Sequence, residues 1–161
     1  MITFDRAKEL LEYNAETGIL TRKVARSRFK AGDVAGYAND EGYIRICIDG
    51  RYYYGHQIAW LLYYGVWPAR QIDHRSRVRH ENWISNLREA TNGQNSHYAN
   101  KKISTSSGYR GVYFKKSESK WCAKIMSEGK TIHLGYFDDP AVAAEAYKAA
   151  AIKFHGEFAN V

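Results

Sequence analysis

Three side chains in the middle of the chain have the types and spacing of a hydrolytic metal site. Asp73 and His74 end the run "RQIDH", and Asn95 ends the run "TNGQN". Hard cations such as Mg²⁺ take oxygen ligands and usually bind one or two protein groups together with water and substrate phosphate. The sequence therefore predicts that Asp73 and Asn95 hold one divalent ion, Mg²⁺, with Mn²⁺ as the alternative.

His74 stands next to this predicted ion, where it would act as a general base. An imidazole accepts a proton from water near neutral pH, and a metal ion stabilises charge on a scissile phosphate and its leaving oxygen. Together these groups could hydrolyse a phosphodiester. Arg75, Arg77 and Arg79 follow His74 in a charged loop over residues 75–81, which is either a solvated loop or, as we predict beside a phosphate site, a DNA contact.

The elements around these residues form a compact unit of two strands and a helix. "RQIDH" (residues 70–74) and "WISNLR" (residues 83–88) are expected strands. Thr91 and Gln94 have the spacing of a capping box, which predicts that a helix starts there. If that helix packs across the hairpin, Asp73 and Asn95 converge.

The preceding part of the chain is expected to be scaffold. "TFDRAKELLEYN" (residues 3–14) predicts a short helix capped by Thr3. "GYIRICIDGRYYYG" predicts a hairpin that turns at Asp49-Gly50, and "HQIAWLLYYG" predicts a helix that stops at Gly65. The many aromatic residues of this part favour core packing over the alternative, a base-stacking platform.

The motifs "GHQIAWLLYYGVWP", "IDH", "SNLREAT" and "QN" resemble the HNH endonucleases of the ββα-metal type, particularly their phage and intron homing members. The resemblance covers roughly residues 10–100 and gives Asp73 and Asn95 the place of metal ligands and His74 that of the base. It further implies that Asn86 pins the hairpin loop through bonds to backbone, and that His56 helps with the phosphate or with packing. Relatives usually have a glycine-containing polar turn after the Asp-His pair, so Arg77 is expected to adopt a conformation that glycine tolerates more easily.

Residues 108–161 predict a second module of three strands and a helix. The helix is expected to begin at Asp139-Pro140 and to lay a stripe of small and apolar residues that includes Phe154 on one face of the sheet. The other face would be bare and basic, carrying Tyr113, Lys115, Lys124 and His133, with Arg110 near its edge. A bare basic sheet face suits insertion of strands into a DNA groove, and its alternative is a solvated sheet surface.

The motifs "YRGV", "KWCAKI", "HLGYFDDPAVAAEAY" and "HGEFAN" resemble the plant ethylene-response-factor (Apetala-two-type) DNA-binding domain over residues 108–160. The positions that contact DNA in that family carry these residues here: Arg110, Tyr113, Lys115, Lys124, Thr131 and His133. Several arginines of the family are replaced here. Arginine can make two parallel hydrogen bonds to one base, whereas lysine acts as a point charge, so a looser sequence preference is expected.

Whole-chain properties narrow the class of protein. The net charge of the 161-residue chain is +7, which fits a polyanionic partner or a merely basic soluble protein. The two cysteines, Cys47 and Cys122, have no CxxC spacing, so neither a structural zinc site nor a disulfide scaffold is expected. No apolar run approaches a membrane span and no signal peptide is evident, which predicts a cytoplasmic protein without a membrane partner, in the host bacterial cell if it is phage-encoded.

These observations predict an α+β protein with an HNH nuclease domain at residues 1–100 (metal-site unit about 68–100), a linker at 101–107 and a DNA-binding domain at 108–161. The predicted activity is metal-dependent cleavage of double-stranded DNA by a site-preferring nicking or homing-type endonuclease. A single site favours a monomer, and a double-strand break would need a dimer or sequential action. The rival interpretations are a DNA-binding regulator whose nuclease unit has decayed and a nuclease for structured RNA.

Overall fold

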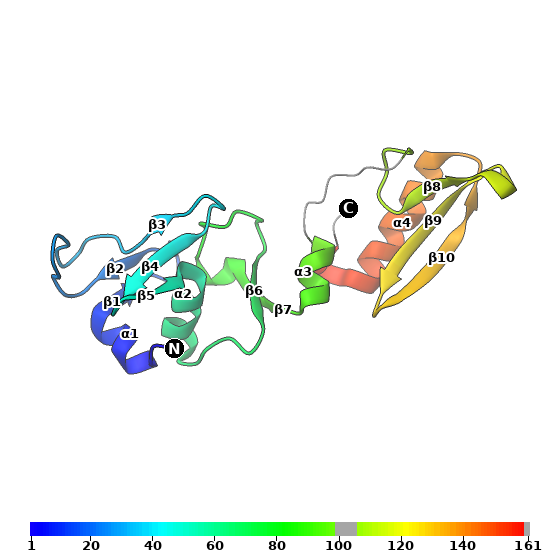
Figure 1. Ribbon diagram of the computed structural model, residues 1–161. Coiled ribbons are helices and arrows are strands. Elements are labelled where there is room, and N and C mark those ends of the chain that lie inside the picture. The colour runs from blue at the N-terminus through cyan, green and yellow to red at the C-terminus, as the bar shows by residue number, and fades with distance from the viewer. Residues whose placement is uncertain (99–105, 160–161) are drawn as a thin grey trace. The chain divides into compact units, whose positions relative to one another are not determined.

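The structure is a computed structural model that describes residues 1–98 and 106–159. The chain divides into two compact units, Met1–Thr91 (unit 1) and Asn92–Val161 (unit 2), each of which holds helices and antiparallel strands (Figure 1). The predicted α+β class is confirmed. Residues 101–105 of the predicted linker lie outside the described residues.

Unit 1 contains three small antiparallel sheets, β1-β2, β3-β4-β5 and β6-β7. Its elements in chain order are α1 (Phe4–Leu10), β1 (Leu11–Tyr13), β2 (Leu20–Arg22), β3 (Tyr37–Ala38), β4 (Ile44–Ile48), β5 (Arg51–Tyr54), α2 (Gly55–Tyr64), β6 (Gln71–His74), the 3₁₀ turn η1 (Ile84–Asn86) and β7 (Leu87–Ala90).

The first helix is shorter than its sequence predicts. The Thr3 hydroxyl caps it by accepting a bond from the Arg6 amide at 3.3 Å, as expected. The predicted continuation to residue 14 is wrong, because Leu11–Tyr13 turns into strand β1 and pairs with β2. Tertiary pairing therefore overrides the local helix preference of this segment.

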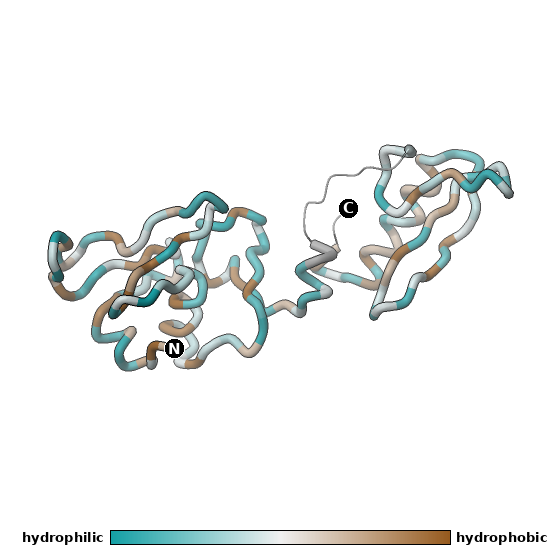
Figure 2. Tube along the Cα trace, viewed as in Figure 1, coloured by the Kyte–Doolittle hydropathy of each residue, from teal (hydrophilic) through white to brown (hydrophobic). Residues whose placement is uncertain are grey.

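The hairpin β4–β5 and helix α2 are confirmed. Asp49 (φ 47°) and Gly50 (φ 78°) form the two-residue turn of the hairpin, in which both residues need positive φ. Helix α2 stops at Gly65, which takes the left-handed conformation. Ile46 and Ile58 from these elements are fully buried in the core, where hydrophobic segments of the chain gather in Figure 2.

The segment 83–88 differs from its predicted strand. Residues Ile84–Asn86 form a 3₁₀ turn, closed by the Asn86 amide on the Trp83 carbonyl at 3.0 Å, and the strand begins only at Leu87. The register of β6-β7 then places His74 opposite Leu87 and Asp73 opposite Arg88.

Unit 2 packs a three-stranded sheet, in the order β10-β9-β8, against helix α4. Its elements are α3 (Asn92–Tyr98), β8 (Val112–Lys115), the 3₁₀ turn η2 (Lys116–Glu118), β9 (Lys120–Ser127), β10 (Lys130–Phe137), α4 (Pro140–His155) and the 3₁₀ turn η3 (Gly156–Phe158). Along the first part of β10, the hydrophobic residues Ile132 and Leu134 alternate with the exposed residues Thr131 and His133, as expected for a sheet with one covered face.

Helix α4 begins as predicted, with the Asp139 carboxylate accepting from the Ala141 amide at 2.6 Å. Ala143 and Ala150 lie buried against the sheet. The place predicted for Phe154 in this buried stripe is wrong. Phe154 is 40% exposed, and Ala151 on the other side of the stripe is buried instead.

Candidate nuclease site and nucleic-acid interface

His74 ends strand β6 in a closely packed pocket. Its side chain is 4% exposed, and its Nε2 atom lies 3.0 Å from Oδ1 of Asn82. Because an amide oxygen only accepts, Nε2 carries the proton and the lone pair is on Nδ1. The imidazole therefore has one nitrogen held by the fold and one available as a base.

Asn82 is itself held by the N-terminal part of unit 1. The Tyr13 hydroxyl donates to the Asn82 carbonyl at 2.7 Å, and the Ile84 amide donates to the Ala15 carbonyl at 3.0 Å. Gly18 approaches so closely that a Cβ there would collide with the backbone of Asn82 and Trp83. The β1–β2 turn thus fixes the residue that orients His74. No motif in the sequence pointed to Asn82, because nothing local links it to His74.

The rings of His56 and Tyr43 lie next to His74, and a third ring stacks on His56. The ring centroid of His56 lies 5.2 Å from that of His74, and Tyr54 stacks on His56 at 5.3 Å. Tyr43 completes the group, 6.1 Å from His74. His56 is buried at 7% exposure, and its Nδ1 has no hydrogen-bond partner in the described part of the chain. The rings exclude water from the imidazoles and so favour their neutral forms.

Burial lowers the pKa of His56 to about 3, and the neighbouring His74 acts in the same direction. Burial also lowers the pKa of His74, although the bond to Asn82 and the charge of Asp73 oppose it. Both histidines are therefore neutral at physiological pH, the form that a general base needs.

Acidification is expected to destabilise unit 1 through His56. Below its ordinary pKa near 6.5 the unfolded chain takes up a proton that the folded chain refuses until about pH 3, so stability is present above pH 6.5 and is lost as the pH falls. The loss from pH 7 to pH 5 should be about 2 kcal/mol for this residue. Urea unfolding followed by tryptophan fluorescence at both pH values measures it.

The matched variants are His56→Gln and His80→Gln, the second on an exposed loop residue. The difference between the two pH values should shrink in His56→Gln and persist in His80→Gln. An equal acid loss in the wild type and His56→Gln contradicts the assignment.

Asp73 lies beside His74 and is paired across the hairpin with Arg88. Arg88 donates from Nε to Oδ2 at 2.8 Å, and its Nη2 forms an ion pair with the same oxygen at 2.7 Å. Arg88 is 6% exposed. Oδ1 of Asp73 has no hydrogen bond within the described residues, so one carboxylate oxygen is left for a cation. Sequence reasoning missed Arg88, although opposite charges on facing strands are a usual pairing.

Asn86 joins the loop 75–81 to the hairpin. Its Oδ1 accepts from the Ser76 amide at 2.7 Å, and its Nδ2 donates to the Glu81 carbonyl at 2.6 Å. Its own carbonyl accepts from the Arg75 amide at 2.8 Å. Both ends of the loop are therefore tied to one buried side chain.

The loop itself carries the three predicted DNA-binding arginines, all exposed. Arg77 has φ of 64°, which confirms the expected left-handed conformation after the Asp-His pair, and its amide donates to the His74 carbonyl at 2.9 Å. Arg79 donates to the Glu41 carbonyl at 2.9 Å, with its guanidinium 4.8 Å from the centroid of the Tyr43 ring. The loop thus presents positive charge next to His74.

Asn95, the second predicted metal ligand, lies in α3 at the start of unit 2, whereas Asp73 lies in unit 1. Their pairing around one ion therefore stays a prediction. Within the described residues no group of three His, Cys, Asp or Glu side chains gathers as a metal site. A site made of one carboxylate and one amide is not a group of that kind, and the open Oδ1 of Asp73 fits the predicted donor set.

The sheet face of unit 2 that α4 leaves uncovered carries the predicted DNA-binding residues. Lys124 lies opposite His133 in the register, and its ammonium group is 4.6 Å from the centroid of the Tyr113 ring. Lys115 donates to the Tyr136 hydroxyl at 2.6 Å. Thr131 and His133 are exposed on β10, and Arg110 is half-buried ahead of β8.

Strict alternation misses Tyr136 on this face. A register irregularity between His133 and Gly135 inserts one residue, so Tyr136 falls on the same side as His133, with ring centroids 4.6 Å apart. Tyr136 and Tyr113 flank Cys122 in the register, and Cys122 is only 1% exposed on a face that was expected to be bare. The face is therefore part aromatic and part basic.

Comparisons with known proteins found two kinds of similarity. Residues 53–97 match the family model of the HNH endonucleases. This HNH segment spans β5 to α3 and contains His56, Asp73, His74, Asn86 and Asn95. It is less than half of the chain.

A second similarity concerns plant proteins. The chain is 47% identical over 58 residues to APETALA2-like protein 2 of Oryza sativa subsp. indica, and 45% identical over 58 residues to AP2-like ethylene-responsive transcription factor TOE2 of Arabidopsis thaliana. The aligned part is 36% of this chain in both comparisons, and 13% and 12% of the respective relatives. The chain thus spans only a small fraction of these curated relatives. No solved structure was found to match it.

An HNH segment joined to an AP2-like segment is thus supported by independent similarities. Among the described residues, no helix is long and apolar enough to cross a membrane.

Proposed function

We propose that the chain is a metal-dependent endonuclease that hydrolyses phosphodiester bonds of double-stranded DNA. The observation that carries the proposal is His74: a neutral, buried imidazole whose Nε2–H is held by Asn82, beside the open Oδ1 of Asp73, within the HNH segment. This combination supplies an oriented base next to an oxygen ligand, the two parts that hydrolysis of a phosphodiester needs.

Each residue has a proposed role. Nδ1 of His74 takes a proton from water as the water oxygen attacks phosphorus and the scissile P–O bond breaks. Asp73 and Asn95 would hold a divalent ion, Mg²⁺ or Mn²⁺, which when bound stabilises the charge on the phosphate and the leaving oxygen. His56 excludes water beside His74, and Asn86 keeps the loop in place, so that Arg75, Arg77 and Arg79 meet neighbouring phosphates.

The AP2-like segment, predicted at residues 108–160, is proposed to bind the duplex and give the enzyme its site preference. The relatives carry "transcription factor" or "APETALA2-like" in their names, and the sheet face with Lys115, Lys124 and His133 is basic and exposed. A nuclease tethered to a DNA reader works at a raised local concentration of its target. A single site favours nicking by a monomer, in the manner of phage or intron homing enzymes.

A DNA-binding regulator without catalysis is the second candidate. The Asp73–Arg88 ion pair favours it, because a buried positive charge next to a cation site lowers the affinity for the cation. Burial of His74 also favours the regulator, because the attacking water must reach Nδ1 and burial restricts its access.

Supercoiled plasmid separates the two candidates. The proposed enzyme converts it to nicked or linear circles with Mg²⁺ or Mn²⁺, and EDTA abolishes the conversion. Binding of the plasmid without cleavage in Mg²⁺, Mn²⁺ and Co²⁺ would establish the regulator instead.

The contribution of unit 2 is tested on its exposed sheet face. Each of Lys115→Gln and Lys124→Gln should weaken binding of duplex DNA in EDTA. Each should also lower the slope of log K against log salt by about 0.9, the amount expected for one lost phosphate contact. Fluorescence anisotropy across a salt series measures both.

The matched control is Lys148→Gln, an exposed lysine of α4, the helix on the opposite side of the sheet. An unchanged slope in the sheet variants, or an equal change in Lys148→Gln, contradicts a specific role for this face.

A further inference from the structure

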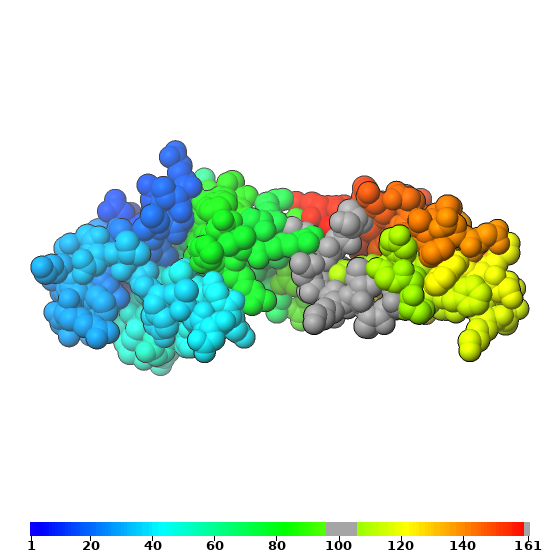
Figure 3. All heavy atoms as spheres, turned by 90° about the horizontal axis from the view of Figure 1, so that it is seen from above, coloured from blue at the N-terminus to red at the C-terminus, as the bar shows by residue number. Residues whose placement is uncertain are grey.

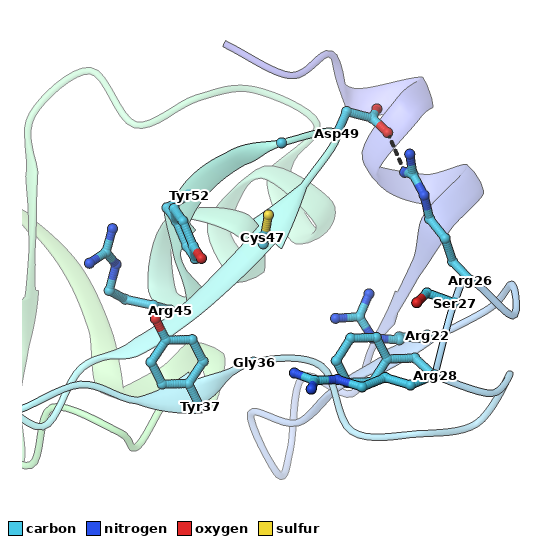
Figure 4. Close-up of a pocket in the computed structure, with 12 residues that line it drawn as sticks. Arg22, Arg26, Ser27, Arg28, Gly36, Tyr37, Arg45, Cys47, Asp49 and Tyr52 are labelled. Carbon is cyan, nitrogen blue, oxygen red and sulfur yellow. Dashed lines mark hydrogen bonds and ion pairs between the residues drawn. The ribbon is translucent and has the colours of Figure 1, made fainter.

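Unit 1 carries a basic hollow that neither the HNH segment nor the predicted DNA-binding residues include. It has a volume of about 580 Å³ and lies between the chain that follows β2 and the β4–β5 hairpin. These two segments adjoin on the surface in Figure 3, the first in light blue and the second in cyan. Arg22, Arg26, Arg28 and Arg45 all line the hollow (Figure 4), which we name the arginine hollow.

Three of these guanidinium groups have no carboxylate partner in the described part of the chain. Each lies instead against an aromatic ring: Arg22 and Arg28 at 4.2 and 5.1 Å from the centroid of Phe29, and Arg45 at 4.6 Å from that of Tyr52. Nε of Arg22 is buried and lacks a hydrogen-bond partner among the described residues. Stacking on a ring orders a planar guanidinium group and leaves its N–H edge available to donate to a ligand.

Asp49, the acidic side chain among the described residues that line the hollow, is already neutralised. Asp49 accepts from Arg26 at 2.7 Å and from Arg6 at 2.9 and 3.1 Å (the Arg26 bond is dashed in Figure 4). Its carboxylate therefore repels an incoming anion only weakly. The hollow keeps a clear excess of positive charge, which selects anions and, because guanidinium forks match phosphate oxygens, phosphates in particular.

A row of side chains connects the arginine hollow to His74 within unit 1. The register places Tyr37 opposite Arg45 and Arg45 opposite Tyr54 across β3-β4-β5, and Tyr54 stacks on His56 beside His74. Tyr37 and Tyr52 on this face are 54% and 56% exposed. A ligand that extends from the hollow along this face reaches the proposed cleavage site, which favours a polymer over a free phosphate or nucleotide.

We propose that the arginine hollow binds the phosphodiester backbone of the DNA duplex on one side of the cleavage site. This deepens the proposed function and rests on it for the identity of the polymer. The hollow adds phosphate contacts from the N-terminal part of the chain, so that the HNH segment holds its substrate without depending on unit 2 alone. Phosphate contacts of this kind position the protein on the duplex and carry no sequence information themselves.

Cys47 offers a direct test because it is an exposed thiol that lines the hollow (Figure 4), whereas the other cysteine, Cys122, is buried. The full-length protein is alkylated with iodoacetamide in EDTA, with and without a duplex oligonucleotide, and modification is followed by intact mass. At a DNA concentration about ten times its Kd, alkylation of Cys47 should slow about tenfold. Cys122 reports on any unfolding.

Two variants sharpen the result. The double variant Arg28→Gln/Arg45→Gln should lose most of the protection by DNA, measured as the ratio of rates with and without DNA within the variant. Lys8→Gln, an exposed charge on α1, should keep it. Unchanged alkylation of Cys47 at saturating duplex overturns the proposal, and so does protection by single-stranded DNA or RNA but not by duplex.

The outcome is separable from that of the proposed function. A protein that cleaves plasmid while Cys47 stays reactive refutes the hollow alone. If DNA protects Cys47 but the protein cleaves no plasmid, the DNA-binding role of the arginine hollow is supported and the proposed nuclease activity is refuted.

Discussion

Replacing His74 by alanine is expected to lower plasmid cleavage by about 10²- to 10⁴-fold, the range for loss of a general base. The reason is the geometry of the ring: Asn82 holds Nε2–H, and only Nδ1 is left to accept the proton of water. Single-turnover cleavage of supercoiled plasmid in Mg²⁺ measures the rate, and anisotropy with labelled duplex in EDTA measures binding, which should change little.

The control for this substitution is His80→Ala, an exposed histidine of the loop that follows His74. It should cleave at close to the wild-type rate. Asn82→Ala should fall between the two, because the ring would keep its base but lose the bond that fixes its tautomer. A His74→Ala protein that still cuts at the wild-type rate assigns the chemistry to another group.

Substitution of Asp73 by asparagine is expected to abolish detectable cleavage and to destabilise unit 1 as well. The variant removes the carboxylate with which the buried Arg88 guanidinium pairs across the hairpin, and breaking a buried ion pair in this way costs about 3–5 kcal/mol. Urea unfolding measures the loss of stability, and the plasmid assay measures activity.

A double variant separates the two roles of Asp73. In Asp73→Asn/Arg88→Met both charges of the buried ion pair are removed, so much of the stability should return while cleavage stays absent. Asp40→Asn, at an exposed turn, is the neutral control. Cleavage that recovers together with stability in the double variant would mean that Asp73 serves the fold and not the ion.

Sequence patterns were sufficient where local chemistry decides the structure. The Asp49-Gly50 turn, the Gly65 helix end and the Asp139 cap each depend on residues within a few positions of one another, and all three formed as predicted. The positive φ of Arg77 was expected for a different reason, the glycine that the resembling family carries after its Asp-His pair, and the structure has it.

Patterns failed where a distant partner decides. Leu11–Tyr13 is helical by local preference but pairs with β2, and the 3₁₀ turn at Ile84–Asn86 follows from bonds between Asn86 and a loop. The register irregularity after His133 reverses the alternation that placed residues on faces of the sheet. None of these is visible in a window of a few residues.

The candidate site divides along the same line. Asp73 and His74 could be chosen by type and spacing, because a carboxylate can bind a cation and an adjacent imidazole can accept a proton. Their partners, Arg88 and Asn82, became evident only once the hairpin register and the packing of the β1–β2 turn were known. The joint role of Asp73 and Asn95 remains a prediction.

The contacts of Tyr13, Ala15 and Gly18 with Asn82–Ile84 bear on how small a working nuclease could be. A fragment trimmed to residues 53–97 would contain every proposed catalytic group, yet nothing would stop the amide of Asn82 from turning away from the imidazole. Engineering a minimal cutter from this chain, or grafting its HNH segment onto another DNA reader, therefore calls for carrying the first twenty residues along with it.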